Sequence, residues 1–243
     1  MNINPLFETV EEWVECPEHG SFPLRRMAGL GIKTGCSKCH ERVTAQHRLD
    51  EVAARGARYL AEAGIPRRFE RASLSDLRSD GENAEAHALV REYLENLETK
   101  LNAGAGLILC GNIGTGKTHS VCHLVRAACE RGRRALFVSL ADFLARVRST
   151  YGDGVESEDA VMRRFTDPSL LAIDEVRAEV LTDYGRETLF RLINKRYNAG
   201  RATLITSNLQ PKDLAAAAGA PTVDRLRSGG GAIAVFRGSS GRG

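Results

Sequence analysis

Short apolar runs alternate along most of the chain with longer segments whose apolar residues recur every three or four positions. The short runs predict β-strands and the longer segments predict amphipathic helices. The predicted strands are 107–109, 134–139, 169–173, 202–206 and 231–236. The predicted helices are 46–63, 84–102, 117–131, 141–151, 157–165, 184–199, 211–217 and 221–228. This alternation indicates an α/β fold in which helices cover both faces of a parallel sheet.

A glycine-rich loop lies between the strand at 107–109 and the helix at 117–131. Residues 111–118 fit the pattern G-x-x-x-x-G-K-[ST], in which backbone N–H groups and a lysine hold nucleotide phosphates. A chance glycine-rich turn is the alternative, and the strand before and the helix after the loop disfavour it. The residues expected around bound ATP are Gly111, Asn112, Gly114, Thr115, Gly116, Lys117, Thr118 and His119.

Two acids follow the apolar strand at 169–173. An acid at this place holds Mg²⁺ in phosphate-loop NTPases, so we expect Asp174 and the Thr118 hydroxyl to bind magnesium. Glu175 is then placed to activate the attacking water as general base, and Asn208, after the next strand, to orient it. An acidic turn without catalytic role is the alternative. The expected catalytic residues here are Lys117, Asp174, Glu175 and Asn208.

Paired cysteine and histidine residues lie near the N-terminus. Cys16 and His19 form a C-x₂-H pair, and Cys36 and Cys39 form a C-x₂-C pair. Such spacing brings four nitrogen and sulfur atoms to one tetrahedral Zn²⁺, which would supply the folding energy of a short segment. Unrelated cysteines are the alternative reading, and His40 is a second candidate for the histidine ligand. The other cysteines, Cys110, Cys122 and Cys129, lack paired spacing and are expected to be buried apolar residues.

Composition places the chain among ordinary globular proteins. It has 243 residues, of which 42% are hydrophobic and 27% charged, and its net charge of +3 does not by itself indicate a nucleic-acid partner. The apolar runs are shorter than a membrane span, and the first twenty residues contain five glutamates, so we expect a cytoplasmic protein without a membrane partner. We expect a zinc-binding module at 1–48, a helical linker at 49–65 and an ATPase domain at 66–243.

Three of these motifs together resemble a known family. Residues 111–118, 171–175 and 206–208 are similar to the Walker A, Walker B and sensor 1 motifs of AAA+ ATPases, in particular of the DnaC/IstB group. Three flanking segments extend the resemblance over about residues 64–242: they lie at 64–74, 223–226 and 236–242. The chain departs from the group at Gly238, where the closing segment of the group has an aromatic residue.

The resemblance implies roles for residues that the motifs alone do not assign. It implies an AAA+ (ASCE) sheet flanked by helices and a homo-oligomer in which Arg225 acts on the nucleotide of a neighbouring subunit. A surface salt bridge is the alternative for Arg225. The resemblance places Arg242 near the nucleotide, and it places Arg146 and Arg148 along a groove for single-stranded DNA, where a solvated helix face is the alternative.

The resemblance also implies a function in DNA replication. We expect an ATPase that uses ATP and Mg²⁺ to load a DnaB-type replicative helicase onto single-stranded DNA. A zinc module in front is typical of the phage and prophage members, and it is expected to bind the helicase. One alternative is an IstB-like transposition helper acting on duplex DNA. The other is a zinc-dependent adaptor that binds ATP without hydrolysing it.

Overall fold

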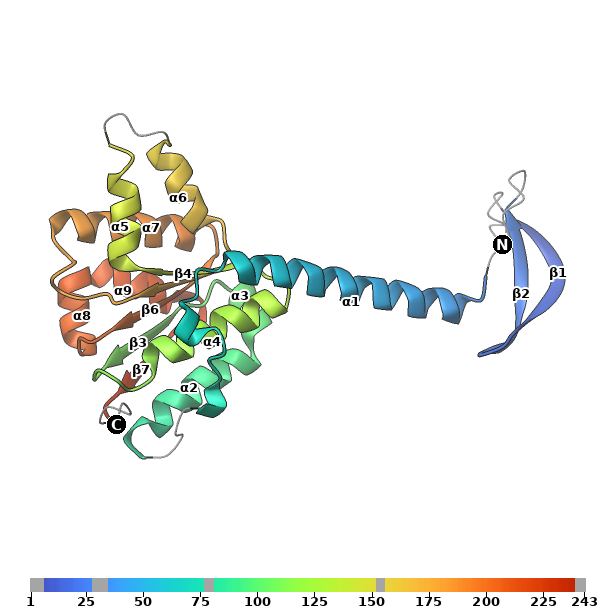
Figure 1. The fold of residues 1–243 in the computed structure, drawn as a ribbon, viewed down its shortest axis with the longest axis horizontal. Helices are drawn as coiled ribbons and strands as arrows, with labels where there is room; N and C mark the ends of the chain where they lie inside the picture. The colour runs from blue at the N-terminus through green and yellow to red at the C-terminus, as the bar shows by residue number, and fades with distance from the viewer. Residues whose placement is uncertain (1–6, 28–34, 77–80, 152–155, 239–243) are drawn as a thin grey trace. The chain divides into compact units, whose positions relative to one another are not determined.

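The computed structural model describes residues 7–27, 35–76, 81–151 and 156–238. The chain divides into two units, which are named here the front unit (residues 1–54) and the main unit (residues 55–243). Both units are drawn in Figure 1. Within the described ranges, none of the helices combines the length and the apolar character needed to cross a bilayer.

The front unit consists of a β-hairpin followed by the start of a long helix. Strand β1 (Phe7–Cys16) pairs antiparallel with β2 (Gly20–Met27), and Cys16 lies opposite Gly20 beside the turn. Helix α1 (Ser37–Glu62) then runs from the front unit into the main unit. The prediction that this helix begins at residue 46 was wrong by nine residues. A C-x₂-C spacing is also one helical turn, so the cysteine pair is compatible with a helix that begins at residue 37.

The main unit contains a five-stranded parallel sheet with the order β4-β5-β6-β3-β7. The strands are β3 (Leu107–Gly111), β4 (Ala135–Ser139), β5 (Leu170–Asp174), β6 (Ala202–Ser207) and β7 (Ala232–Phe236). Because neighbouring strands are parallel, their carboxyl ends meet at one edge of the sheet. This order brings the glycine-rich loop after β3 next to the end of β6 and close to the acids after β5.

Helices cover the sheet on both faces, as the sequence predicts. They are α2 (Ala84–Glu95), α3 (Leu97–Asn102), α4 (Lys117–Glu130), α5 (Leu140–Arg148), α6 (Glu158–Thr166), α7 (Asp183–Asn198), α8 (Pro211–Ala218) and α9 (Ala220–Arg227). The single helix expected at 84–102 is divided at Asn96. Its side-chain amide donates to the Glu92 carbonyl at 3.0 Å, and such a local bond competes with the helical ladder.

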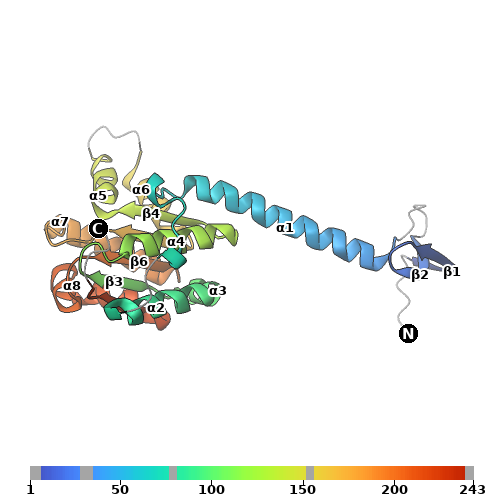
Figure 2. The ribbon, with the colours of Figure 1, turned by 60° about the horizontal axis from the view of Figure 1, so that its bottom comes forward.

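Two apolar clusters lie on opposite faces of the sheet. Leu107 and Leu109 of β3 join the cluster of α2, α3 and α4, whereas Ile108 and Cys110 join that of α5 to α9. The period of two along a strand separates these faces. Figure 1 shows the two groups of helices on either side of the sheet, and Figure 2 shows α4 crossing the sheet, where it contacts β4, β5 and β6. The three cysteines of this unit are buried, as predicted.

A fully buried arginine joins the end of α7 to the sheet. Arg196 donates hydrogen bonds from all three guanidinium nitrogens, and burial lowers its pKa to about 9. Nε bonds the Thr203 hydroxyl at 2.8 Å and Nη2 bonds the Ala202 carbonyl at 2.5 Å, both on β6. Nη1 bonds the carbonyls of Phe165 and Thr166 at the end of α6 and that of Pro168 before β5. The start of β6 is thereby tied to two neighbouring segments.

Candidate functional site

The loop between β3 and α4 has the backbone of a phosphate-binding loop. Gly111, Gly114 and Gly116 have φ values of 112°, 79° and 92°, in the left-handed region that favours glycine. A β-carbon at Gly111 would lie 2.1 Å from the Phe236 carbonyl oxygen, so only glycine fits there. Gly116 directly precedes the first residue of α4, and the first N–H groups of that helix therefore face the loop.

Side chains of the same loop hold its shape. The Lys117 ammonium group donates to the Gly111 carbonyl at 2.9 Å and also to the Asn112 carbonyl. The Thr115 hydroxyl donates to the same Asn112 carbonyl at 2.8 Å. Burial lowers the pKa of Lys117 to about 8. The predicted phosphate-binding lysine is therefore buried inside the curve of the loop, where a nearby phosphate would favour its charged form.

A carboxylate and two hydroxyl groups form the adjoining cluster. The Thr118 hydroxyl lies 3.0 and 3.2 Å from the two oxygens of Asp174, and Thr206 donates to the Asp174 carboxylate as well. Burial raises the pKa of Asp174, while both threonine hydrogen bonds lower it. Hydroxyl and carboxylate oxygens are the ligands that Mg²⁺ prefers, so Thr118 and Asp174 fit the magnesium site expected from the sequence.

Thr206 is a residue of this cluster to which we had given no role. It sits on β6 within the segment that resembles sensor 1, in which we expected Asn208 to act. Ile173 pairs with Ile205 across β5 and β6, so Asp174 and Thr206 are neighbours one position further on. The sequence alone does not give this register, so no local pattern pointed to Thr206. Asn208 follows β6 with an exposed side chain at the same edge of the sheet.

Glu175 lies at the edge of this cluster. Its backbone has φ 58°, a left-handed value that non-glycine residues rarely adopt, and its N–H donates to the Thr206 hydroxyl at 3.1 Å. Its side chain is 53% exposed, and the carboxylate forms an ion pair of 2.6 Å with Arg177. Such strained backbone conformations persist only where the surrounding structure holds them, and they often occur at functional sites. The expected general base therefore sits beside the magnesium ligands with its carboxylate paired to Arg177.

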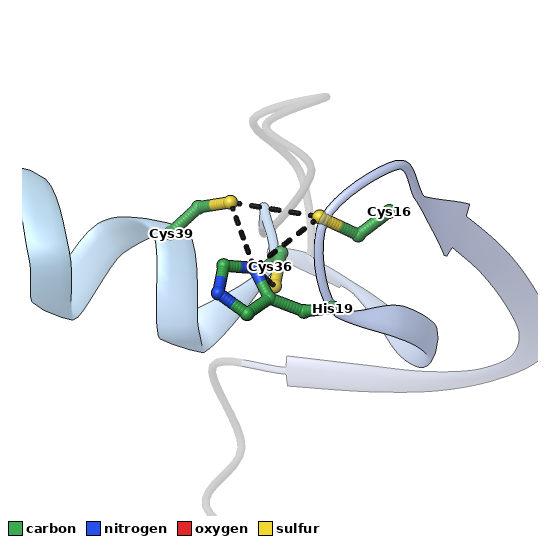
Figure 3. A group of neighbouring side chains, drawn as sticks. All are labelled: Cys16, His19, Cys36 and Cys39. Atoms are coloured by element: carbon green, nitrogen blue, oxygen red, sulfur yellow. Dashed lines mark hydrogen bonds between the residues drawn. The ribbon is translucent and has the colours of Figure 1, made fainter.

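The four predicted zinc ligands of the front unit lie together (Figure 3). Their ligand atoms are all within 4.8 Å of one another, and Nδ1 of His19 lies 3.3–3.7 Å from the three sulfurs. A tetrahedral zinc with bonds of about 2.3 Å to sulfur and about 2.0 Å to nitrogen separates its ligands by roughly 3.5–3.8 Å. The cluster fits that geometry, whereas His40 is exposed and stands outside it.

The cysteine thiols of this cluster differ in pKa. A hydrogen bond from the Glu18 backbone, followed by one from His19, lowers the pKa of Cys16 to about 6. Hydrogen bonding with Cys16, followed by burial, raises the pKa of Cys39 to about 11. Negative charge at several sulfurs this close is unfavourable without a cation, since like charges oppose one another. The donor set of three sulfurs and one imidazole is one that zinc accepts.

The main unit contains a segment that matches a known protein family. Residues 77–224 match the family described as IstB-like ATP binding protein. The chain belongs to this family. Its members are P-loop ATPases, which agrees with the loop and the acidic cluster described above.

Curated relatives of this IstB-like protein include replicative helicase loaders. The DnaC loader of Escherichia coli K12 is 24% identical over 146 residues, which are 60% of this chain and 58% of the loader. The chain thus matches less than two thirds of that relative's length. The DnaC loader of Buchnera aphidicola (subspecies Baizongia pistaciae) is 25% identical over 71% of this chain and 70% of its own. An ATP-binding protein in an insertion sequence of Mycobacterium tuberculosis is 31% identical over 46% of this chain and 44% of its own.

Solved structures share the fold of this IstB-like ATPase. The crystal structure of the DnaC helicase loader superposes with a TM-score of 0.61 and 25% identity, covering 70% of this chain and 99% of the other. The replication initiator DnaA bound to AMPPCP and single-stranded DNA gives a TM-score of 0.58 at 22% identity, over 72% of this chain and 51% of its own. The predicted AAA+ architecture is therefore confirmed.

The closing segment of the IstB-like protein is fastened beneath the phosphate loop. The Asn112 amide donates to the Arg237 carbonyl at 2.6 Å, and Asn83 accepts from the backbone N–H groups of Arg237 and Gly238. A β-carbon at Gly238 would lie 2.5 Å from the Asn83 amide nitrogen, so Asn83 fills the space beside this glycine. No sequence motif pointed to Asn83. Arg242, expected near the nucleotide, lies outside the described residues.

The first helix after the loop is bound to the segment that precedes α2. His119, expected among the nucleotide-binding residues, directs Nε2 to the Ser73 carbonyl at 2.7 Å. Further along α4, His123 bonds the Ala72 carbonyl at 3.0 Å and Arg126 bonds the Glu70 carbonyl at 2.8 Å. Residues three and four apart lie on one helix face, so this face of α4 holds the segment at 70–73.

The remaining predicted arginines lie on other helices of the IstB-like ATPase. Arg225 on α9 is held against α7, where its Nε donates to Asn194 at 2.8 Å. Arg146 and Arg148 near the end of α5 have exposed side chains that lie over aromatic rings of Phe165 and Tyr184, at 6.0 and 4.7 Å. These three residues are thus not members of the cluster formed by Lys117, Thr118 and Asp174.

Proposed function

We propose that this chain is an ATP-hydrolysing loader that places a DnaB-type replicative helicase on single-stranded DNA. The observation that carries the ATPase assignment is the meeting of Thr118 with Asp174 beside Lys117, in a family of ATP-binding proteins. The helicase assignment is supported by relatives described as replicative helicase loaders.

The residues of the site have separate tasks in this proposal. Loop N–H groups and the Lys117 ammonium bind the ATP phosphates, while Thr118 and Asp174 hold Mg²⁺, which neutralises phosphate charge. Glu175 takes a proton from the attacking water once its carboxylate leaves Arg177. Asn208 orients that water, and Arg225 reaches the nucleotide of a neighbouring subunit. The hydrogen bonds from Thr118 and Thr206 favour the ionised form of Asp174, against the burial that raises its pKa.

Two surfaces serve the partners. The front unit, folded around zinc held by Cys16, His19, Cys36 and Cys39, holds the helicase. Arg146 and Arg148 contact the phosphate backbone of single-stranded DNA, where basic side chains add affinity for any sequence. ATP binding assembles several chains along the DNA, because each complete site needs an arginine from the next chain.

A capture experiment tests this assignment. Full-length chain is passed over immobilised DnaB-type helicase of the source organism, with and without ATP. The Cys36→Ser/Cys39→Ser variant should lose capture, while the matched control His40→Ala, an exposed neighbour outside the cluster, should keep it. Absence of capture for the wild-type chain in both conditions would contradict the loader assignment.

A second candidate function is an IstB-like transposition helper. The family description and the relative in an insertion sequence favour it. ATP-dependent filaments on duplex DNA, seen by negative-stain microscopy without helicase capture, would support this function over the first. The third reading, an adaptor without turnover, is opposed by the intact Asp174 and Glu175 pair and by the family of ATPases.

A further inference from the structure

Arg225 is held by contacts with α7 and with its own helix, α9. Its Nε donates to the Asn194 side-chain oxygen at 2.8 Å, and Nη1 donates to the Pro221 carbonyl at 3.1 Å. Its guanidinium also lies 4.8 Å from the ring centre of Phe190 and 5.9 Å from that of Tyr197. Two hydrogen bonds and two ring contacts restrict both the direction of the side chain and the plane of its guanidinium group.

All of these contacts are electrically neutral. Some arginines of the main unit pair with acids instead: Arg177 with Glu175 at 2.6 Å, and Arg191 with Glu158. Throughout the part of the chain that the structure describes, Arg225 forms no ion pair with a carboxylate, and its Nη2 donates no hydrogen bond. An amide oxygen, a carbonyl and two ring faces therefore orient the side chain while its full positive charge is kept.

This difference has a chemical consequence for an arginine that must act on phosphate. A carboxylate partner would cancel much of the charge and compete with the phosphoryl oxygens for the guanidinium N–H groups. A neutral acceptor on Nε leaves Nη2 free to donate and costs no charge. Stacking on an aromatic ring further limits the swing of a long side chain, so less conformational entropy is lost when it reaches a ligand.

We infer that Asn194 and Phe190 are positioning residues that fix Arg225 in advance for the nucleotide of a neighbouring subunit. This inference rests on the proposed function of Arg225. An arginine supplied to a phosphoryl-transfer site is worth about 10³–10⁵ in kcat, and misplacing a group by 1 Å costs roughly 100-fold. The loss of Asn194 should therefore lower kcat by about 10- to 100-fold and leave KM for ATP nearly unchanged, because the contact matters in the transition state.

Steady-state ATP hydrolysis by full-length variants tests the inference. Asn194→Ala removes the acceptor, whereas Asn194→Asp keeps an acceptor oxygen and adds a charge that pairs with Arg225. Both should lower kcat; a purely structural hydrogen bond would leave the Asp variant at the wild-type rate. Asn198→Ala is the matched control, because Asn198 is exposed and lies one turn further along α7. Melting temperatures identify variants that fail to fold.

Mixed oligomers assign the defect to the correct side of the interface. Glu175→Gln supplies an intact Arg225 without a base, and Arg225→Ala supplies a base without the arginine, so a mixture of the two should regain activity. The double variant Glu175→Gln/Asn194→Ala should restore about 10-fold less than Glu175→Gln does. Asn194→Ala should itself be rescued by Glu175→Gln, which donates a well-positioned arginine.

The outcomes separate the two claims. Wild-type turnover by Arg225→Ala would overturn the proposed role of Arg225 and this inference with it. Loss of turnover in Arg225→Ala, together with wild-type kcat in Asn194→Ala or Asn194→Asp, would overturn the inference alone. Equal rescue by the single and double Glu175→Gln variants would also overturn it, since positioning by Asn194 would then contribute nothing in trans.

Discussion

The front unit and the main unit differ in what stabilises the fold of each. Among the side chains described in the front unit, Cys16 and Cys36 are the buried ones, and Trp13, Val43 and Leu49 are each more than 60% exposed. The main unit buries two apolar clusters against a five-stranded sheet. Burying one large apolar side chain contributes about 1.5–3 kcal/mol, so many such residues stabilise the main unit and few stabilise the front unit.

The two units should also differ in whether their folding depends on a bound metal ion or nucleotide. Zinc binding supplies about 10–16 kcal/mol to small structural zinc modules, which are otherwise unfolded. The front unit, with two ligands on the hairpin, Cys36 directly before α1 and Cys39 on its first turn, fits that description. The main unit has an apolar core on both faces of its sheet, so its fold should survive without metal or nucleotide.

The largest expected effect is the loss of zinc from the front unit. Cys36→Ser/Cys39→Ser should release one zinc per chain, and residues 7–54 should become sensitive to protease. ATP affinity should stay within about twofold, because the nucleotide site lies in the main unit. Metal analysis, limited proteolysis and calorimetric ATP titration measure these changes. A collapse of ATP binding in this variant would show that the two units are not independent.

A change within the catalytic site should leave both units folded. Glu175→Gln removes the general base and should lower kcat by about 10²–10⁴-fold while ATP binding persists. Zinc content and melting temperature should match those of the wild-type chain. Single-turnover hydrolysis and a fluorescent-nucleotide titration measure the two quantities. Loss of nucleotide binding in the folded variant would exclude the role assigned to Glu175.

Removal of the buried arginine tests the core of the main unit. Arg196→Ala leaves the carbonyls of Phe165, Pro168 and Ala202 without their donor, so unfolding free energy should fall by about 3–5 kcal/mol. The exposed neighbour Arg201→Ala should change it by less than about 0.5 kcal/mol. Urea unfolding measures both. The Arg196→Ala variant should keep its zinc. Release of zinc from this variant would show that the fold of the front unit depends on that of the main unit.

The smallest expected effect is a proton linkage at the phosphate loop. The pKa of Lys117 is lowered to about 8, and a bound phosphate should raise it again. ATP binding should therefore take up a proton above pH 8, and affinity should fall by up to about 1.4 kcal/mol per pH unit there. Below pH 8 the ammonium is already charged and uptake should vanish. Calorimetry in two buffers of different ionisation enthalpy measures the uptake, and Lys117→Met should abolish it.

The same pKa shift acts on stability with the opposite slope. Lys117 binds a proton more weakly in the folded chain than in the unfolded chain, whose value is near 10.5. Unfolding therefore takes up a proton between about pH 8 and 10.5, and the contribution of this group to stability rises with pH across that window. Below pH 8 both states are protonated, and the full burial penalty opposes folding.

The sequence predicted the sheet and the phosphate loop well because both depend on local patterns. Apolar runs identified five strands, and the loop pattern identified Gly111 to Thr118. Strand order followed from no local signal, and so Thr206, brought to Asp174 by the register of β5 and β6, received no role. Asn83 accepts a hydrogen bond from the Gly238 N–H, 155 positions further along the chain, and a short sequence motif does not reveal such a long-range contact.

The front unit was the harder part to predict. Ligand identity followed from cysteine and histidine spacing, and the structure brings Cys16, His19, Cys36 and Cys39 together. The hairpin was not predicted, since a segment with little apolar burial carries a weak period-two signal. The start of α1 was missed because its first turn consists of polar residues and metal ligands rather than a recurring apolar face.

The depth of the cysteines in the main unit has a practical consequence for labelling. Burial raises the pKa of Cys110 and Cys129 to about 11 and that of Cys122 to about 12, so these thiols stay protonated and shielded at neutral pH. Maleimide or iodoacetamide, which react with thiolates, should modify them slowly. Added together with a chelator, such a reagent should label Cys16, Cys36 and Cys39 of the front unit and leave the cysteines of the main unit unmodified. Fluorophores can therefore be attached to the front unit of the native chain without replacing any cysteine.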